Sequence, residues 1–118
     1  MSKKKLGQLI KQLRNEKKPK KMTLRELADE VDVTFVNIAH IENGRIKTSK
    51  KVLKQIAEAL DYDVDELLAA GDEVDDDIEK IISKKPTAVP EFLRTARNLT
   101  EEQWKTLTEQ VKNMEGNK

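Results

Sequence analysis

The sequence predicts an all-α protein, and three observations indicate this. Only 3% of the 118 residues are aromatic, so a core must be built from Leu, Ile, Val and Ala, which suits a small helical bundle better than a sheet. Apolar residues recur at spacings of three and four along the chain, which is the period of an amphipathic helix. Residues that cap helices precede several of these segments. We therefore expect a series of short helices.

Composition excludes several classes of function. The chain has no cysteine and one histidine, which excludes disulfides and thiol chemistry and leaves no set of transition-metal ligands. It has no long apolar run, and its basic start lacks the apolar region of a standard signal peptide. The sequence shows neither a nucleophile paired with a base nor a glycine-rich loop, so it does not indicate catalysis. We therefore expect a cytoplasmic protein that is not an enzyme, spans no membrane and needs no cofactor or metal.

Charge divides the chain into two halves. Residues 1–60 contain 15 Lys and Arg against 7 Asp and Glu, a balance of +8, whereas residues 61–118 contain 8 against 15, a balance of −7. Residues 61–79 hold 10 acidic side chains and no basic one. Such a run is either a solvated connector with carboxylates at helix starts, or a polyanionic segment that discourages wrong approaches to DNA or docks on a basic partner.

The first two predicted helices lie in the basic half. An apolar stripe predicts a helix over residues 4–17, which ends before the loop KKPKKM because Pro19 breaks it. Thr23 can cap the next helix with its hydroxyl, and Glu26 three residues later completes a capping box. The sequence thus predicts two helices before residue 32.

Three more helices are predicted up to residue 70. Thr34 offers an N-cap for the third, and Gly44 offers a left-handed stop at its end. Ser49 caps a fourth helix, and a fifth short helix precedes Gly71. This gives five helices in about seventy residues, which is the usual size of a small helical domain.

Residues 71–118 predict three further helices. The acidic residues 75–77 lead the first, Pro90 suits the first turn of the second, and Thr100 with Gln103 forms a capping box for the third. An appendage this small can hardly bury its apolar face alone. Self-association through it is the simplest solution.

The segments TLRELADEVDVTFVNIAHIENGR and SKKVLKQIAEALDYDVDELL resemble the lambda-repressor-like, or XRE-type, helix-turn-helix family. The resemblance rests on the Leu27-Ala28 pair, the following turn, the I-x-x-I-E-x-G motif from Ile38 to Gly44, and the closing A-x-A-L and D-E-L-L motifs. It implies a five-helix lambda-repressor-like DNA-binding domain over residues 1–70. Residues 71–118 would then be a small three-helix domain for dimerisation or regulation.

The resemblance implies a base-reading set on the third helix, consisting of Phe35, Val36, Asn37 and His40. Asn37 can pair with an adenine edge, His40 with N7 or O6 of a purine, and the apolar pair with thymine methyl groups. The alternatives are that Phe35 and Val36 cover the underside of the second helix and that His40 is an idle surface residue.

A second set would contact phosphates and position the protein without reading sequence. This set consists of Thr23, Thr34, Asn43, Arg45, Lys47, Thr48 and Lys51. The alternative is that these residues are ordinary surface charge. The resemblance also implies a structural ion pair between Arg14 of the first helix and Glu42 at the end of the third.

The chain departs from the family pattern at three places. Leu24 stands where the family usually has a glutamine that contacts phosphate, and Asp32 replaces the usual glycine of the turn, where a left-handed conformation suits glycine better. The loop before the second helix is longer than usual. Its lysines either replace the missing phosphate contact or are only solvated; they are Lys17, Lys18, Lys20 and Lys21.

The stretch VPEFLRTARNLTEEQWKTL is similar to the C-terminal domain of repressors of the DdrO and ImmR type. In those repressors a partner zinc metalloprotease cuts the C-terminal domain, which destroys the dimer. The likeness implies a cut in this region. Because the predicted helix is short and follows a stretch rich in helix breakers, we expect the cut within Phe92 to Asn98, with the bond between Leu93 and Arg94 favoured. The alternative is that FLRTAR is merely an amphipathic helix. The residues implied for dimerisation are Phe92, Leu93, Trp104, Leu107 and Val111.

The sequence therefore predicts a homodimeric repressor that binds palindromic operators in double-stranded DNA. We also expect a protease to inactivate this repressor in a DNA-damage or mobile-element response. Two alternatives stay open. One is an antitoxin that wraps a toxin and represses its own operon. The other is an interaction module that has lost DNA binding, for which Leu24, Phe35 and Val36 are the evidence. A neighbouring gene for a HExxH metalloprotease or a small toxin would separate them.

Overall fold

The computed structural model describes residues 3–116, and over this range the chain forms eight α-helices and no strand. The all-α prediction is confirmed. Contacts divide the chain into two compact units, residues 1–78 and 79–118, and the domain boundary predicted after residue 70 stays a prediction. The first unit contains α1 (Lys3–Glu16), α2 (Leu24–Asp29), α3 (Phe35–Glu42), α4 (Lys50–Ala59) and α5 (Val64–Ala70).

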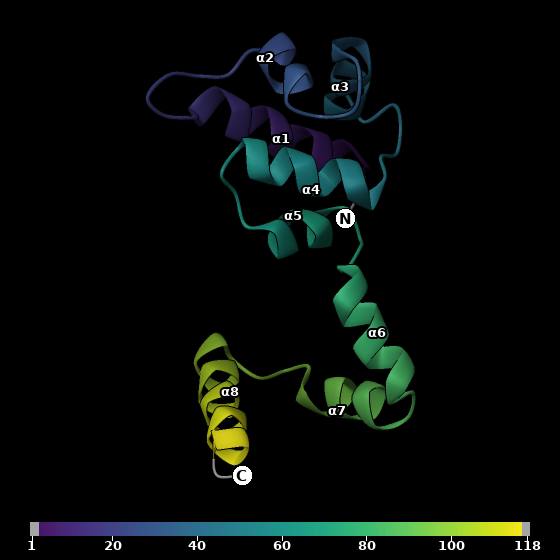
Figure 1. Ribbon diagram of the computed structural model, residues 1–118, viewed down its shortest axis with the longest axis vertical. Helices are drawn as coiled ribbons and strands as arrows, with labels where there is room; N and C mark the ends of the chain where they lie inside the picture. Colours follow the sequence, from purple (N-terminus) through teal and green to yellow (C-terminus); the bar gives the residue numbers. More distant parts are fainter. Residues whose placement is uncertain (1–2, 117–118) are drawn as a thin grey trace. The chain divides into compact units, whose positions relative to one another are not determined.

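The five helices of the first unit share one apolar core. Figure 1 shows α2 and α3 as neighbours above α1, and α3 contacts both of them, while α5 contacts α4 and α1. Each helix contributes at least one fully buried aliphatic side chain; among these are Ile10, Leu27, Ile38, Ile56 and Leu67. Because burial of such side chains is the main stabilising contribution to folding, this unit has a complete core of its own.

The predicted N-caps of the first unit are confirmed. Thr23 forms the capping box, since the Glu26 N–H donates to Thr23 Oγ1 at 3.1 Å and the Thr23 N–H donates to Glu26 Oε1 at 3.0 Å. Thr34 and Ser49 each accept a hydrogen bond of 3.2 Å from the N–H three residues further on. These bonds satisfy N–H groups that have no partner inside the helix.

The end of α3 is a Schellman turn. The Gly44 N–H donates to the Ile41 carbonyl at 3.1 Å, and the Arg45 N–H donates to the His40 carbonyl at 2.9 Å. Gly44 has φ of +71°, so the predicted left-handed stop is confirmed. The chain leaves α3 in a fixed direction as a result.

Two of the described residues besides Gly44 have positive φ. Within residues 3–116 the non-glycine residues with positive φ are Asp61 at 55° and Asp72 at 60°, which follow α4 and α5. Asp32 is not among them. The turn from α2 to α3 therefore closes without the left-handed conformation for which glycine is usual at this position. Aspartate tolerates the left-handed region better than most residues, which suits it to the two helix ends.

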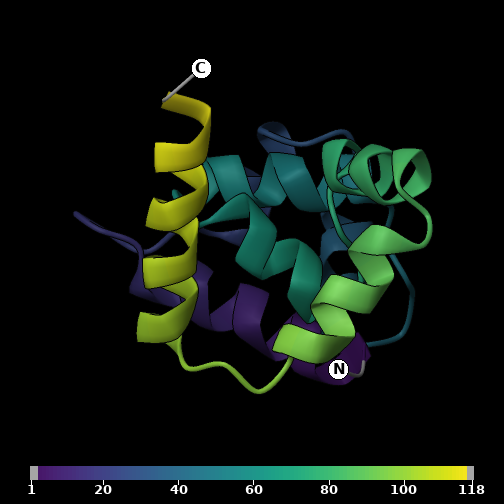
Figure 2. The same ribbon diagram turned by 90° about the horizontal axis from the view of Figure 1, so that it is seen from below.

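The second unit contains the remaining helices, which Figure 2 shows in colours from green to yellow. They are α6 (Asp76–Lys84), which begins in the first unit, α7 (Ala88–Ala96) and α8 (Glu101–Gly116). Pro90 lies in the first turn of α7 as predicted. The capping box of α8 is also confirmed: the Gln103 N–H donates to Thr100 Oγ1 at 3.1 Å, and the Thr100 N–H donates to Gln103 Oε1 at 2.9 Å.

Little apolar surface is buried within the second unit. Among residues 79–116 the only buried hydrophobic side chain is that of Ala96. Phe92 and Trp104 meet edge to face, with ring centroids 6.2 Å apart, but Phe92 remains 47% exposed. None of the described helices combines the length and apolar character needed to cross a bilayer.

Gly7 marks the point where α1 lies against the end of α3. A Cβ atom built at Gly7 would overlap the carbonyl oxygens of Ile41 and Glu42, and these backbone atoms cannot rotate away. Gly7→Ala should therefore lower the free energy of unfolding by about 1–3 kcal/mol through overpacking, although alanine favours helix more than glycine does. Urea denaturation would measure the loss. Gly116→Ala is the control, because nothing lies within 4 Å of its added Cβ, and equal stability of both variants would contradict the close approach.

Candidate nucleic-acid interface

The two faces of α3 differ sharply in burial. Ile38 and Ile41 are 0% and 2% exposed and belong to the core. The predicted base-reading side chains lie away from that core: Phe35, Val36 and Asn37 are exposed and His40 is half-buried. An exposed helix face of this kind can enter the major groove of B-DNA, which is wide enough for an α-helix.

The predicted phosphate-contacting residues gather at helix ends and in the loop between α3 and α4. Thr23 and Thr34 are the N-caps of α2 and α3. The others follow α3 or begin α4, and all are exposed except the half-buried Thr48; they are Asn43, Arg45, Lys47, Thr48 and Lys51. Helix starts and the loops around them are where phosphates are commonly bound, but the role of each residue stays a prediction.

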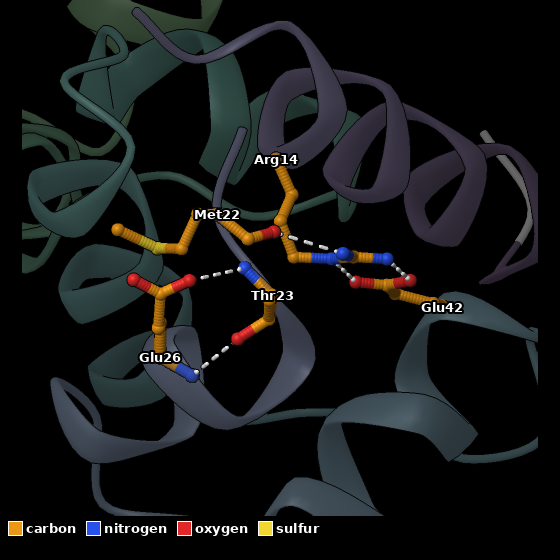
Figure 3. Close-up of polar contacts among 5 residues, drawn as sticks. All are labelled: Arg14, Met22, Thr23, Glu26 and Glu42. Carbon is orange, nitrogen blue, oxygen red and sulfur yellow. Dashed lines mark hydrogen bonds and ion pairs between the residues drawn. The ribbon is translucent and has the colours of Figure 1, made fainter. Parts of the chain in front are cut away.

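Arg14 and Glu42 form a buried bidentate ion pair, the contact that the family resemblance implied (Figure 3). Arg14 Nε lies 2.8 Å from Glu42 Oε2 and Nη2 lies 3.0 Å from Oε1. The remaining nitrogen, Nη1, donates to the Met22 carbonyl at 2.9 Å. One guanidinium thus joins α1, the last residue of α3 and the loop before α2.

A second polar contact, which the sequence did not reveal, ties the turn before α3 to α4. The Asp32 N–H donates to Gln55 Oε1 at 3.0 Å, and Gln55 Nε2 donates to Asp32 Oδ2 at 3.0 Å. Lys51 Nζ lies 3.1 Å from the same carboxylate oxygen. The bonds from Gln55 and then Lys51 hold the pKa of the Asp32 carboxyl below its usual value. Lys51, which was predicted to contact a phosphate, therefore also pairs with the Asp32 carboxylate in this turn.

Part of the acidic run pairs with lysines of α4 in the same unit. Lys54 Nζ lies 3.0 Å from Asp75 Oδ1, and Lys50 Nζ lies 3.3 Å from Asp76 Oδ1 and 3.7 Å from Glu73 Oε2. The hydrogen bond with Lys54 lowers the pKa of the Asp75 carboxyl and raises that of the Lys54 ammonium. The run is also partly helical, because it contains α5 and the start of α6. It is more than a solvated connector.

Two residues of α2 also bear on this surface. Leu24 is half-buried and packs against the core, so it does not project outward as a polar contact would. Arg25 is exposed, and its guanidinium carbon lies 4.3 Å from the centroid of the Phe35 ring. Sequence reasoning missed this contact, because nothing in the spacing of positions 25 and 35 indicates that they meet.

Removing one partner of the buried ion pair tests its contribution to stability. Arg14→Met should lower the free energy of unfolding by about 3–5 kcal/mol, because it leaves the Glu42 carboxylate buried without its counter-charge. The double variant Arg14→Met/Glu42→Leu should recover much of that loss, since apolar groups of similar size often replace a buried pair at little cost. Both variants lose the bond to the Met22 carbonyl, so their difference reports the cost of the unpaired Glu42 carboxylate. Equal instability of the two variants in urea would contradict this explanation.

Comparison with known proteins agrees with this geometry. Residues 10–67, from within α1 into α5, match the model of the helix-turn-helix family. No curated protein matches the chain. Within residues 3–116, no group of three or more His, Asp or Glu side chains could hold a metal ion. The family match and the exposed face of α3 together support an XRE-type helix-turn-helix, DNA-binding transcription regulator.

Proposed function

We propose that this protein is a transcriptional repressor that binds a palindromic operator sequence-specifically as a homodimer. The observation that carries the proposal is the exposed first turn of α3, capped by Thr34 and anchored by a buried inner face, within a segment that matches the helix-turn-helix model. In such domains the start of the second helix of the motif contacts base edges in the major groove. In this chain that helix is α3.

The base-reading roles follow from the chemistry of the exposed side chains. Asn37 can bind an adenine edge with two hydrogen bonds, and His40 can bind N7 or O6 of a purine. Val36, which is 48% exposed, can touch a thymine methyl group. The hydroxyl, amide and cationic residues around α3 would then bind phosphates, which sets the register of α3 without reading the sequence.

Substitutions should separate base readers from phosphate contacts. Asn37→Ala and His40→Ala should each weaken binding to the preferred operator by about 1–3 kcal/mol and have little effect on random DNA. Arg45→Ala and Lys47→Ala should weaken binding to both DNAs. Each should also reduce the salt slope, which is the slope of the logarithm of the binding constant against the logarithm of the salt concentration, by about one unit. Fluorescence anisotropy titrations at several salt concentrations would measure both effects.

Lys105→Ala is the matched control for these substitutions, because it removes one exposed positive charge from α8 in the second unit. Its salt slope should equal that of the unmodified protein. Equal losses on the preferred and random DNAs for Asn37→Ala and His40→Ala would contradict base reading. An unchanged salt slope for Arg45→Ala or Lys47→Ala would remove that residue from the phosphate set.

The apolar surface of the second unit supports dimerisation. Phe92, Leu93 and Val111 are 47%, 44% and 48% exposed, and Trp104 and Leu107 are half-buried. Large apolar side chains that a unit leaves uncovered are typical of protein interfaces. One recognition helix covers only a half-site, so a second copy related by a two-fold axis would read the other half of a palindrome.

Truncation should test the role of the second unit. A chain ending at Ile78 keeps the pairs that Lys50 and Lys54 make with the acidic residues before it, and α1–α5 have a complete core. We expect it to be folded and monomeric at micromolar concentration, with weaker operator binding because the half-sites are no longer linked. Sedimentation velocity and circular dichroism would measure this. A truncated chain that still forms dimers would show that the interface lies in residues 1–78.

We further propose that a zinc metalloprotease inactivates the repressor by cutting α7 between Leu93 and Arg94. The helix has nine residues, and Thr87 at its N-cap makes no side-chain capping bond. Residues 92–95 are all exposed. A short helix with few buried contacts opens locally at low cost in free energy, and an opened segment can bind a protease groove as an extended strand. The cut would detach α8 and its share of the proposed interface.

Cleavage can be tested by co-expression with a HExxH metalloprotease, if a gene for one lies beside this gene. Co-expression should give two fragments whose masses place the cut between Leu93 and Arg94. Leu93→Asp should resist the cut, because it replaces the apolar side chain next to the bond with a charged one. An intact wild-type chain, or cuts only at the termini, would contradict the proposal and favour the antitoxin alternative.

A further inference from the structure

Arg25 is held against an aromatic ring at the edge of the proposed DNA-binding face. Its guanidinium carbon lies 4.3 Å from the centroid of Phe35, the first residue of α3. No carboxylate within residues 3–116 forms an ion pair with Arg25. The Arg25 guanidinium therefore lies over the Phe35 ring and makes no ion pair within 4 Å in this part of the chain.

Stacking leaves the donors of a guanidinium available. The five N–H groups of arginine lie in one plane and point outward along it, so a ring over one face does not block them. The ring also restricts the side chain to fewer orientations, which lowers the conformational entropy lost when the donors bind. Arg25 is exposed, so a ligand outside the protein can reach these donors.

The surroundings of Arg25 suit an anionic or acceptor-rich ligand. Arg25 and Phe35 both line two open grooves. Lys21 and Thr23 also line one of them, and Thr34 and Asp29 also line the other. A cation and two hydroxyls thus lie around the guanidinium, together with the carboxylate of Asp29.

We propose that Arg25 contacts DNA directly and that Phe35 is a positioning residue that holds it, and not an independent reader of thymine. This inference rests on the proposed function. The ligand is a pair of hydrogen-bond acceptors that matches the guanidinium fork, provided either by O6 and N7 of guanine or by two phosphate oxygens. Arg25 stands on α2, the helix that crosses the DNA backbone in this motif, and touches the first residue of α3, the helix that enters the groove.

A double-mutant cycle in the full-length protein tests both roles. The probe is the duplex that the wild-type protein selects from a random pool. Arg25→Ala should weaken binding to it by about 5- to 150-fold, the range of one bidentate contact. Arg25→Lys should recover little of this, because an ammonium has no planar fork. Phe35→Leu should weaken binding in the wild-type background but add little to Arg25→Ala, because it acts through that residue.

Phe35→Tyr is the conservative variant, since it keeps the ring face and should recover most of the affinity that Phe35→Leu loses. Circular dichroism of each variant would verify that the fold is retained. The two sources of acceptors are distinguished by where the loss occurs. A guanine edge predicts that Arg25→Ala loses discrimination at one base pair of each half-site, whereas phosphate predicts an equal loss on every duplex and a salt slope lower by about one unit.

Three outcomes would overturn the inference. Wild-type affinity and base preference in Arg25→Ala would remove Arg25 from the contact set. Additive losses for Arg25→Ala and Phe35→Leu would make Phe35 an independent reader, and in both cases the proposed function would stand if the wild-type protein still selects a duplex. A wild-type protein that binds no duplex would overturn the proposed function and this inference together.

Discussion

Arg14 and Glu42 are the two charged residues buried within the described part of the chain, and their ion pair fixes the position of the recognition helix α3. Burial of two charges costs free energy, which the bidentate geometry and the added bond to the Met22 carbonyl offset. The pair holds the last residue of α3 against α1, where the close approach at Gly7 excludes any side chain. The Schellman turn begins immediately after it, so the loop toward α4 starts from a defined position.

Features of the fold that depend on neighbouring residues could be predicted from the sequence. The caps at Thr23, Thr34 and Ser49 and the stop at Gly44 each involve groups within about four residues of one another, so the local sequence contains both partners. The buried face of α3 follows from helical spacing for the same reason. Spacing alone could predict the site only as the exposed face of α3, opposite its buried face. The role of each side chain depends on DNA and is still a proposal.

Contacts between distant residues could not be predicted in this way. The bonds of Asp32 with Gln55, of Lys54 with Asp75 and the stacking of Arg25 on Phe35 join residues on separate helices or turns, and helix packing decides which of them meet. The charge balance of the two halves did not reveal these pairs. Asp75 and Asp76, from the acidic half, pair with lysines of α4, from the basic half, within one unit.

The two units differ in what holds them together, and this difference gives the proposed repressor two separable properties. In the first unit, α3 is anchored by a closed aliphatic core and a buried ion pair, so its reading face does not depend on a partner. In the second unit, large apolar side chains remain exposed, so its stability depends on what covers them. When two DNA-binding units are linked, binding of the first to its half-site raises the effective concentration of the second at the other half-site. The contacts within each half-site do not change. Under the proposed function, a change confined to α7 or α8 would therefore alter operator occupancy while leaving sequence preference intact.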